Sequence, residues 1–316
     1  MIKVAIIGCG KNCGRHISAF EKLDNAKICA VCDVSEEKLR AAMEETGVAG
    51  YSSYAEMFRK EELQLAIVNI PHSLHNPCVR ACAEAGVNVF LEKPMGISIS
   101  DCEEMEKACE RAGVMLWVGH GQSFAPINIR AKQLADSGEY GRLVSITETR
   151  NLFYFSEDRP RWFLQQEISG GGIMMNLGAH ALDKIKFFSG GNIELAVGGR
   201  NIPEGYDVEN SVQAFVRTDN GVTATLNLIG HTAARQYGVT MYLTEGEIQM
   251  LADGTIRACK RDGVFEEIPY DATLSEMDIS IKKAVDAVIS GTKPEIGADY
   301  GKDIIRAIKS IYSGDK

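Results

Sequence analysis

The run Val87-Asn88-Val89-Phe90-Leu91-Glu92-Lys93-Pro94 decides the fold class. Its apolar first part, 87–91, predicts a buried strand, and Pro94 stops that strand because proline has no backbone N–H to donate. Lys93 then stands at the carboxyl end of a strand, where ligands bind in open α/β sheets. A surface lysine in a strand-to-helix turn is the commoner arrangement, so the rest of the chain has to decide between the two.

Further buried strands alternate with helical patterns on both sides of this run. Such alternation predicts a parallel, doubly wound sheet. Ser53-x-x-Glu56 and Ser100-x-x-Glu103 have the pattern of capping boxes, which open helices. The other predicted strands cover residues 2–7, 26–32, 66–70 and 114–118.

A glycine turn joins the first strand to its helix in the sequence Gly8-Cys9-Gly10-Lys11-Asn12-Cys13-Gly14. A strand, a glycine turn and a helix N-terminus in this order predict a loop that binds the phosphates of a dinucleotide. Gly8 permits the tight turn and Gly10 allows close approach of the pyrophosphate. Cys13 occupies the usual third glycine position. A plain turn between strand and helix would also account for the first two glycines.

Asp33 ends the second predicted strand, 25 positions after Gly8 (33 − 8 = 25). An acidic residue at this place accepts hydrogen bonds from the adenosine ribose. Its carboxylate also repels a 2′-phosphate, which favours NAD over NADP. Asp33 is equally suited to cap the helix that begins near Ser35.

The pattern changes after Gly119. A helix over about 126–137 and a strand over 143–150 are followed by an aromatic-rich stretch and a glycine run, 170–172. Residues 193–268 then alternate strand-like segments with turns, which predicts antiparallel sheet. We therefore expect a first domain over 1–119 and a second over 120–316, the last helix being a candidate to pack back on the first.

The composition limits the function classes. The net charge is −9 without a basic tract, which argues against nucleic acid as a partner, and no apolar run reaches the length of a membrane span. The first predicted strand begins at residue 2, without a signal-peptide pattern, so a cytoplasmic location is expected.

The nine cysteines fit a reducing compartment. Their spacing does not match that of a zinc site, so no metal is predicted.

Asn176, His180 and Asp183 lie on a helix predicted over 173–188, and spacings of four and three place them on one face. A polar stripe near a helix start, preceded by three glycines, is typical of a site built for close approach of a ligand. A histidine bonded to a carboxylate on a solvated face would show the same spacing.

Together these motifs resemble the glucose-fructose oxidoreductase / inositol dehydrogenase / rhizopine-catabolism (Gfo/Idh/MocA) family over almost the whole length. The ordered set is specific, although no single member is. The resemblance implies an N-terminal Rossmann domain, a C-terminal α/β domain with a large, open, mostly antiparallel sheet, and a homodimer or homotetramer. It rests on Gly8-x-Gly10, His16, Asp33, Pro71-x-x-x-His75, Glu92-Lys93-Pro94 and Gly170-Gly171-Gly172-x-x-x-Asn176-x-Gly178-x-His180-x-x-Asp183.

The resemblance also implies roles for individual residues. Lys93 matches the lysine that contacts the reacting hydroxyl, and His180 matches the catalytic histidine. Asn176 stands where the family usually has aspartate, so it can form hydrogen bonds but carries no charge. At the domain junction Gly121 and Ser123 replace an asparagine and an arginine of the family pattern. The residues expected to bind the cofactor are Gly8, Gly10, Lys11, Asn12, Asp33, Pro71, His75, Glu92, Lys93 and Trp162.

These observations predict an NAD-dependent oxidoreductase that acts on a hydroxyl of a sugar, cyclitol or related polyol. His180 would take the hydroxyl proton, since an imidazole titrates near neutral pH, and Lys93 would donate to the same oxygen. Two alternatives remain. The enzyme could use bound NAD in a transient oxidation that cleaves or eliminates a glycosidic bond, or the chain could be a non-catalytic dinucleotide-binding sensor.

Overall fold

The computed structural model describes residues 1–314, which form two compact units. The first unit consists of Met1–Gly121 and Glu276–Lys302, and the second of Gln122–Ser275 with the residues from Asp303 onward. The domain boundary predicted after residue 119 stays a prediction.

The first unit contains a six-stranded sheet in the order β3-β2-β1-β4-β5-β6. All five strand pairs are parallel, which confirms the predicted parallel sheet. Its central strands are continuous apolar runs because helices bury both of their faces. The short edge strand β3 was not predicted. The strands are β1 (Ile2–Ile7), β2 (Ala26–Cys32), β3 (Ala49–Tyr51), β4 (Leu65–Val68), β5 (Asn88–Glu92) and β6 (Leu116–Gly119).

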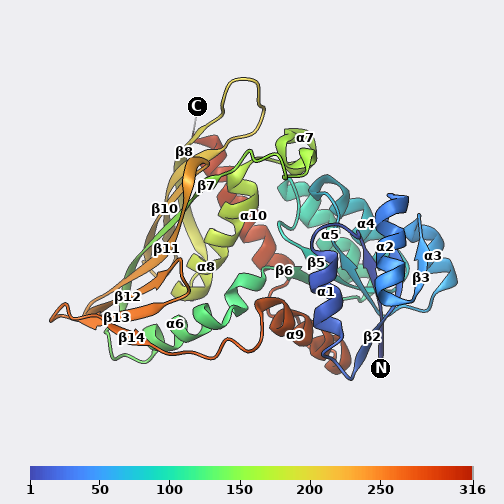
Figure 1. Cartoon of the computed structure of the whole chain (residues 1–316), viewed down its shortest axis with the longest axis horizontal. Coiled ribbons are helices and arrows are strands. Elements are labelled where there is room, and N and C mark those ends of the chain that lie inside the picture. The colour runs from blue at the N-terminus through green and yellow to red at the C-terminus, as the bar shows by residue number, and fades with distance from the viewer. Residues whose placement is uncertain (315–316) are drawn as a thin grey trace. The chain divides into compact units, whose positions relative to one another are not determined.

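Helices cover both faces of this sheet (Figure 1). The strand order reverses between β1 and β4, and right-handed crossovers therefore place α1 and α4 on opposite faces. Helix α1 packs beside α9, and α4 beside α5. The helices are α1 (Cys13–Phe20), α2 (Glu36–Thr46), α3 (Tyr54–Lys60), η1 (His72–Leu74), α4 (His75–Glu84), α5 (Ile99–Ala112) and α9 (Glu276–Ser290).

One of the two predicted capping boxes is correct. Ser53 caps α3, and its side chain accepts from the backbone N–H of Glu56. The box predicted at Ser100 is wrong, because the residue that caps α5 is Ser98, whose hydroxyl accepts from the N–H of Asp101 at 3.1 Å. Both serines precede an acidic residue three places on, and the sequence pattern did not separate them.

The second unit contains an eight-stranded sheet in the order β14-β13-β12-β11-β7-β10-β9-β8. Its neighbouring strands are antiparallel except for β7 and β10, which run parallel. This confirms the mostly antiparallel sheet. The strands are β7 (Leu143–Phe153), β8 (Ile193–Asn201), β9 (Ser211–Thr218), β10 (Thr223–Ile229), β11 (His231–Leu243), β12 (Gly246–Leu251), β13 (Ile256–Lys260) and β14 (Glu266–Ile268).

The helices of the second unit lie on one side of this sheet, as Figure 1 shows for α6, α8 and α10. Side chains along β9 alternate accordingly: Val212 and Val216 are buried, whereas Gln213 and Phe215 are exposed. The helices are η2 (Gly121–Phe124), α6 (Pro126–Asp136), η3 (Arg161–Leu164), α7 (Gln166–Ser169), η4 (Met174–Gly178), α8 (Ala179–Ser189) and the part of α10 (Ala298–Ser313) from Asp303 onward. Within residues 1–314, no helix combines the length and the apolar character that crossing a bilayer requires.

Candidate active site

The carboxyl edge of the six-stranded sheet gathers most of the predicted cofactor-binding residues. Parallel strands end at the same edge, so the residues that follow them become neighbours. The Gly8–Asn12 loop follows β1, Asp33 follows β2, and Pro71 lies two residues beyond the Asn69 that follows β4. Glu92 and Lys93 lie at the end of β5.

The two loop glycines meet different surroundings. Gly8 has φ +97°, and a side chain there would collide with the backbone oxygen of Asn69. Gly8 is therefore required by the turn itself. At Gly10 an added Cβ would meet no atom of the described residues within 4 Å. The open space in front of the α1 N-terminus fits a bound pyrophosphate, which needs close backbone approach at this position.

Asp33 is held by two backbone N–H groups. Its Oδ2 accepts from Cys9 at 2.7 Å, and its Oδ1 accepts from Ser35 at 2.7 Å. The helix cap itself is Ser35, whose hydroxyl accepts from Lys38. Asp33 is half-buried and keeps lone pairs for a ribose hydroxyl, since each carboxylate oxygen can accept more than one hydrogen bond.

Glu92 and His16 form a buried pair at the end of β5. Nε2 of His16 lies 3.0 Å from Oε1 of Glu92. Burial of Glu92 opposes its ionisation, but the hydrogen bond and charge of His16, with a further contribution from Lys93, lower the pKa of Glu92. A carboxylate is therefore maintained next to Lys93, whose side chain is half-buried.

His75 is fully buried, and backbone oxygens surround both of its ring nitrogens. Nε2 lies 3.0 Å from the carbonyl of Ile70, and Nδ1 lies 3.1 Å from that of Pro94 and 3.3 Å from that of Met95. Burial lowers the pKa of His75, although these hydrogen bonds oppose the shift. The ring thus ties the segment after β4 to the segment after β5, and a cofactor contact of His75 stays a prediction.

His120 is a residue at this edge to which the sequence assigned no role. Gly119 pairs with Glu92 in the sheet, so His120 and Lys93 follow paired positions. The His120 ring is completely buried, and within residues 1–314 neither of its nitrogens has a hydrogen-bond partner. Burial, followed by the charge of Lys93, lowers the pKa of His120 to about 3. The sequence feature that could have indicated a role for His120 is its position directly after a strand, at the edge of the sheet where ligands bind.

The remaining predicted site residues belong to the second unit. Trp162 lies in η3 and stacks on Phe163 with ring centroids 3.8 Å apart. Asn176 is buried and lies against the hydroxyl of Tyr154, and His180 is half-buried in the first turn of α8. The structure thus divides the predicted catalytic set, with Lys93 in the first unit and Asn176 and His180 in the second.

The helix predicted over 173–188 is confirmed, but its first part departs from regular α geometry. Residues Met174–Gly178 form a π turn, in which the N–H of Ala179 bonds to the carbonyl of Met174, and the α-helix begins only at Ala179. The wider turn changes the relation between Asn176 and His180 that a regular spacing of four implied. Such turns occur frequently at functional sites.

Asp183 is completely buried rather than part of a solvated face. Its Oδ1 accepts a 2.6 Å hydrogen bond from the hydroxyl of Ser123. Ser123 stands where the family pattern has arginine, so the side chain at this position of the present chain carries no charge. The hydrogen bond joins the segment at the start of the second unit to α8.

A buried charged cluster lies one helical turn after His180. The Nζ of Lys184 lies 2.7 Å from Oε1 of Glu148, and the Nε of Arg150 lies 2.6 Å from the same oxygen. Lys184 also donates to the hydroxyl of Tyr237. Burial, followed by the charge of Arg150, lowers the pKa of Lys184 to about 7. Two spacings in the sequence could have indicated this cluster. Glu148 and Arg150 are two residues apart and so share a strand face, and Lys184 follows His180 by four residues and so shares its helix face.

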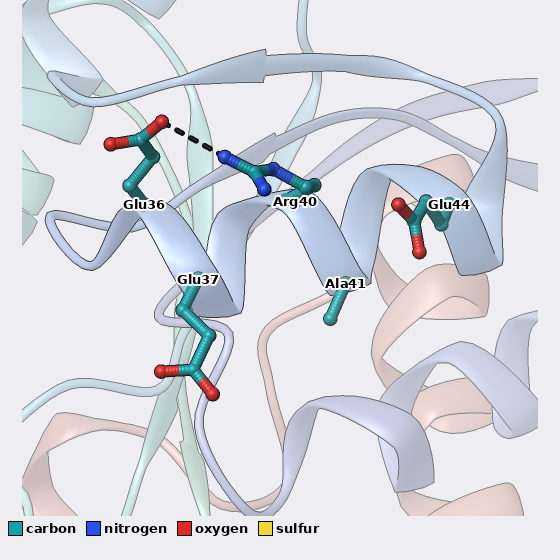
Figure 2. A pocket seen from close by; sticks show the side chains of 5 residues that line it. All are labelled: Glu36, Glu37, Arg40, Ala41 and Glu44. Atoms are coloured by element: carbon teal, nitrogen blue, oxygen red, sulfur yellow. Dashed lines mark hydrogen bonds and ion pairs between the residues drawn. The ribbon is translucent and has the colours of Figure 1, made fainter.

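A hollow on the outer side of α2 contains none of these groups. Figure 2 shows the side chain of Glu36 pointing toward Arg40. An oxygen of Glu36 and a guanidinium nitrogen of Arg40 form an ion pair, 3.0 Å apart. The residues that line this hollow are exposed and mainly acidic, so binding of an anionic ligand there is unfavourable. The lining residues are Glu36, Glu37, Arg40, Ala41 and Glu44.

Within the described part of the chain, no group of three or more His, Cys, Asp or Glu side chains could hold a metal ion.

Comparison with known proteins places this geometry in a family. Residues 2–120 match the model described as "Oxidoreductase family, NAD-binding Rossmann fold" (GFO_IDH_MocA), and residues 129–249 match the GFO/IDH/MocA C-terminal domain. A 1-carboxy-3-chloro-3,4-dihydroxycyclohexa-1,5-diene dehydrogenase of Comamonas testosteroni is 26% identical over 232 residues, which cover 73% of this chain and 58% of that protein. This chain therefore spans less than two thirds of that relative.

Two further proteins are similar over nearly their whole length. The myo-inositol 2-dehydrogenase of Thermotoga maritima is 24% identical over 318 residues, 95% of this chain and 92% of that one. The crystal structure of an aldose-aldose oxidoreductase from Caulobacter crescentus, complexed with glycerol, superposes with a TM-score of 0.91 at 21% identity and covers 99% of this chain and 97% of its own. With both domain models matched in order, this chain belongs to the Gfo/Idh/MocA family of oxidoreductases, which has an NAD-binding Rossmann fold.

Proposed function

We propose that this protein is an NAD-dependent dehydrogenase that oxidises a hydroxyl of a sugar, a cyclitol or a related polyol. The observation that carries the proposal is the half-buried Lys93 at the carboxyl end of β5, at the same sheet edge as the glycine loop and Asp33. The printed activities of the relatives support the substrate class, since one acts on a dihydroxycyclohexadiene and another on myo-inositol.

Residues of the first unit would hold the cofactor. The backbone around Gly10 would receive the pyrophosphate, and Asp33 would accept from the adenosine ribose. The carboxylate of Asp33 would repel a 2′-phosphate, and this favours NAD over NADP. When bound, the nicotinamide supplies the hydride acceptor, which no protein side chain can replace.

Lys93, His180 and Asn176 would serve the reacting hydroxyl. Lys93 would donate a hydrogen bond to the oxygen and stabilise the negative charge that develops as its proton leaves. His180 would take that proton as the general base. Asn176 would hold a substrate hydroxyl through its amide, without the charge of the aspartate usual in the family.

The proposal is tested by the absorbance of NADH. Purified protein is mixed with NAD or NADP and a panel containing myo-inositol, other cyclitols, D-xylose, D-glucose and glycerol. We expect one class of polyol to reduce NAD, with NADP a weaker acceptor. No reduction with any member, although the protein binds NADH, would contradict the proposal.

The same assay separates the alternatives. An enzyme that uses transient oxidation would consume a glycoside while its bound cofactor shows no net reduction. Product analysis by chromatography, with glycosides added to the panel, would detect this. A sensor would bind NADH and convert neither polyol nor glycoside, and the presence of both Lys93 and His180 favours an enzyme.

We also propose that the chain forms a homodimer or homotetramer through the second unit. The register places Val197, Phe215 and Thr225 next to one another across β8, β9 and β10, and Val197 and Phe215 are 44% and 39% exposed. An exposed apolar patch on a sheet is typical of an interface. Light scattering should give a multimer for the wild type and a smaller species for Phe215→Arg, and a monomeric wild type would contradict this.

The cytoplasm is the location we propose. All nine cysteines are free thiols, eight of them buried, and such usage fits a reducing compartment. Fractionation of the source cells would test this, and recovery of the protein outside the cytoplasm would contradict it.

A further inference from the structure

Glu209 is a completely buried carboxylate in the loop between β8 and β9, and it binds the start of the segment that carries Asn176 and His180. Its Oε2 accepts from the backbone N–H of Gly172 at 2.9 Å, and its Oε1 accepts from that of Met174 at 2.9 Å. Its own carbonyl accepts from the N–H of Ile173 at 2.9 Å. One residue thus satisfies three consecutive N–H groups that a helix start leaves without helical partners.

Tyr312 of α10 fixes Glu209 from the other side. Its hydroxyl donates to Oε1 of Glu209 at 2.8 Å. Burial, followed by the charge of Glu209, raises the pKa of Tyr312 well above its ordinary value. The phenol therefore remains protonated and remains a donor, so that the carboxylate is held on two sides.

The glycine run before the π turn is explained by these same two residues. A side chain at Gly172 would overlap the backbone oxygen of Glu209, and one at Gly171 would overlap the hydroxyl of Tyr312. In the sequence, the three glycines predict a site for close approach of a ligand. In the structure, the groups that lie close to the backbone of Gly172 and Gly171 are Glu209 and Tyr312.

The restrained backbone leads directly into the π turn. The N–H of Asn176 bonds to the carbonyl of Gly172 at 3.1 Å, so the residue that Glu209 binds is also the acceptor for Asn176. His180 follows in the first turn of α8. If the backbone of residues 172–174 changed its direction, the hydrogen bond to Gly172 would move Asn176 with it. His180, which follows on the same helical segment, would be displaced as well.

We propose that Glu209, supported by Tyr312, is a positioning residue for the reaction. It fixes the entry into the π turn and so the directions of the Asn176 and His180 side chains, without touching the substrate. The inference rests on the proposed function, because it gives Asn176 and His180 their roles. Within the described residues, the geometry that carries it lies entirely in the second unit.

The test compares Glu209→Gln with Glu204→Gln. Glu204 is an exposed carboxylate on the same loop, so the control removes the same charge. Glu209→Gln leaves one side-chain acceptor oxygen for two N–H groups, and a misplacement of catalytic groups by about 1 Å can lower turnover by ~100-fold. With the panel substrate that the wild type oxidises fastest, we expect kcat to fall by about 10- to 100-fold in Glu209→Gln, while the Kd for NADH is unchanged.

A kinetic isotope effect distinguishes positioning from loss of folded protein. If the base is misplaced, hydride transfer becomes slower relative to product release, and the effect of deuterium at the oxidised carbon on kcat increases. A smaller folded fraction would lower kcat and leave the isotope effect unchanged. Unchanged kcat, or lower kcat with an unchanged isotope effect, in Glu209→Gln would overturn the proposal.

Tyr312→Phe provides a second variant in case Glu209→Gln does not fold. It removes one hydroxyl from Glu209 and leaves the backbone hydrogen bonds in place, so we expect a loss of several-fold in kcat with a larger isotope effect. Wild-type values for both quantities would then overturn the proposal.

Hydrogen exchange separates a failure of this inference from a failure of the proposed function. The peptide that contains residues 170–178 should exchange faster in Glu209→Gln, or in Tyr312→Phe if the former does not fold, than in wild type and Glu204→Gln. This exchange measurement requires no substrate. If the wild type oxidises no panel member, the proposed function fails, while unchanged exchange in this peptide would overturn the role of Glu209 independently.

Discussion

Asp33 accepts a 2.7 Å hydrogen bond from the backbone N–H of Cys9, which joins the residue after β2 to the glycine loop after β1. The two strands are neighbours in the sheet, and their carboxyl ends therefore present the loop and the acid to the same ligand. A second hydrogen bond, from Ser35, fixes the other carboxylate oxygen. The orientation of the acid is thus set by the backbone on two sides.

Asp33→Asn should relax the preference for NAD. The amide keeps one acceptor oxygen for the loop but removes the charge that would repel a 2′-phosphate. We expect the ratio of kcat/KM with NADP to kcat/KM with NAD to rise by about tenfold, equivalent to ~1.4 kcal/mol.

Glu36→Gln is the matched control for this prediction. Glu36 is an exposed acid in the first turn of α2, and its ion pair with Arg40 is also exposed. Its substitution should change the cofactor ratio much less. A ratio in Asp33→Asn that equals the wild-type ratio would contradict a role of Asp33 in cofactor selection.

Ser98→Ala should destabilise the first unit, because the Ser98 hydroxyl accepts from the N–H of Asp101 at the start of α5. Loss of an N-cap costs about 1 kcal/mol of the free energy of unfolding. Ser100→Ala, two residues further on and exposed, should change that free energy by less than ~0.5 kcal/mol. Urea unfolding of both variants measures the difference, and equal costs would show that Ser98 is not the cap.

His120→Phe should make the protein less sensitive to acid. His120 has a pKa of about 3 in the folded state, below the ordinary imidazole value, so the unfolded state binds the additional proton and stability is lost as the pH falls. The groups facing this ring are Lys93, Glu92 and Tyr300. From about pH 7 to about pH 5, the wild type should lose about 2 kcal/mol relative to the variant.

Urea unfolding at several pH values measures this difference. Phenylalanine keeps an aromatic ring at the buried position, 5.9 Å from the ring of Tyr300 in the wild type, and it has no titratable group. Parallel pH profiles for the free energy of unfolding would contradict a buried, neutral His120.

Most of the parallel sheet of the first unit was predictable from sequence because its signals are local. An apolar run, a glycine turn and an acid at fixed spacing follow directly from the demands of a strand, a tight turn and a helix N-terminus. The position of Lys93 followed in the same way, from the proline that stops β5. The short strand β3 was missed because three residues, one of them glycine, give no periodic signal.

For the second unit, the type of sheet was predictable from sequence, but the arrangement of its site residues was not. Alternating strands and turns indicated the antiparallel sheet, but the parallel pair β7 and β10 depends on contacts distant in sequence. The π turn at Met174–Gly178 was missed because a spacing of four fits a regular helix equally well, and the N–H groups that precede the turn bind Glu209, 35 residues after Met174. The buried cluster of Glu148, Arg150 and Lys184 is likewise assembled from separate elements.

The proposed reaction requires that Lys93 and His180 serve one reacting hydroxyl. The decisive measurement is kcat/KM for Lys93→Met, His180→Asn and the double variant, together with NADH affinity by fluorescence. Residues that act as a unit give losses that are far from additive in free energy. We predict losses of at least ~100-fold in each single variant, a double variant close to the more impaired single one, and NADH affinity near wild type. Near-normal turnover in Lys93→Met, or single losses that multiply fully in the double variant, would contradict the central claim.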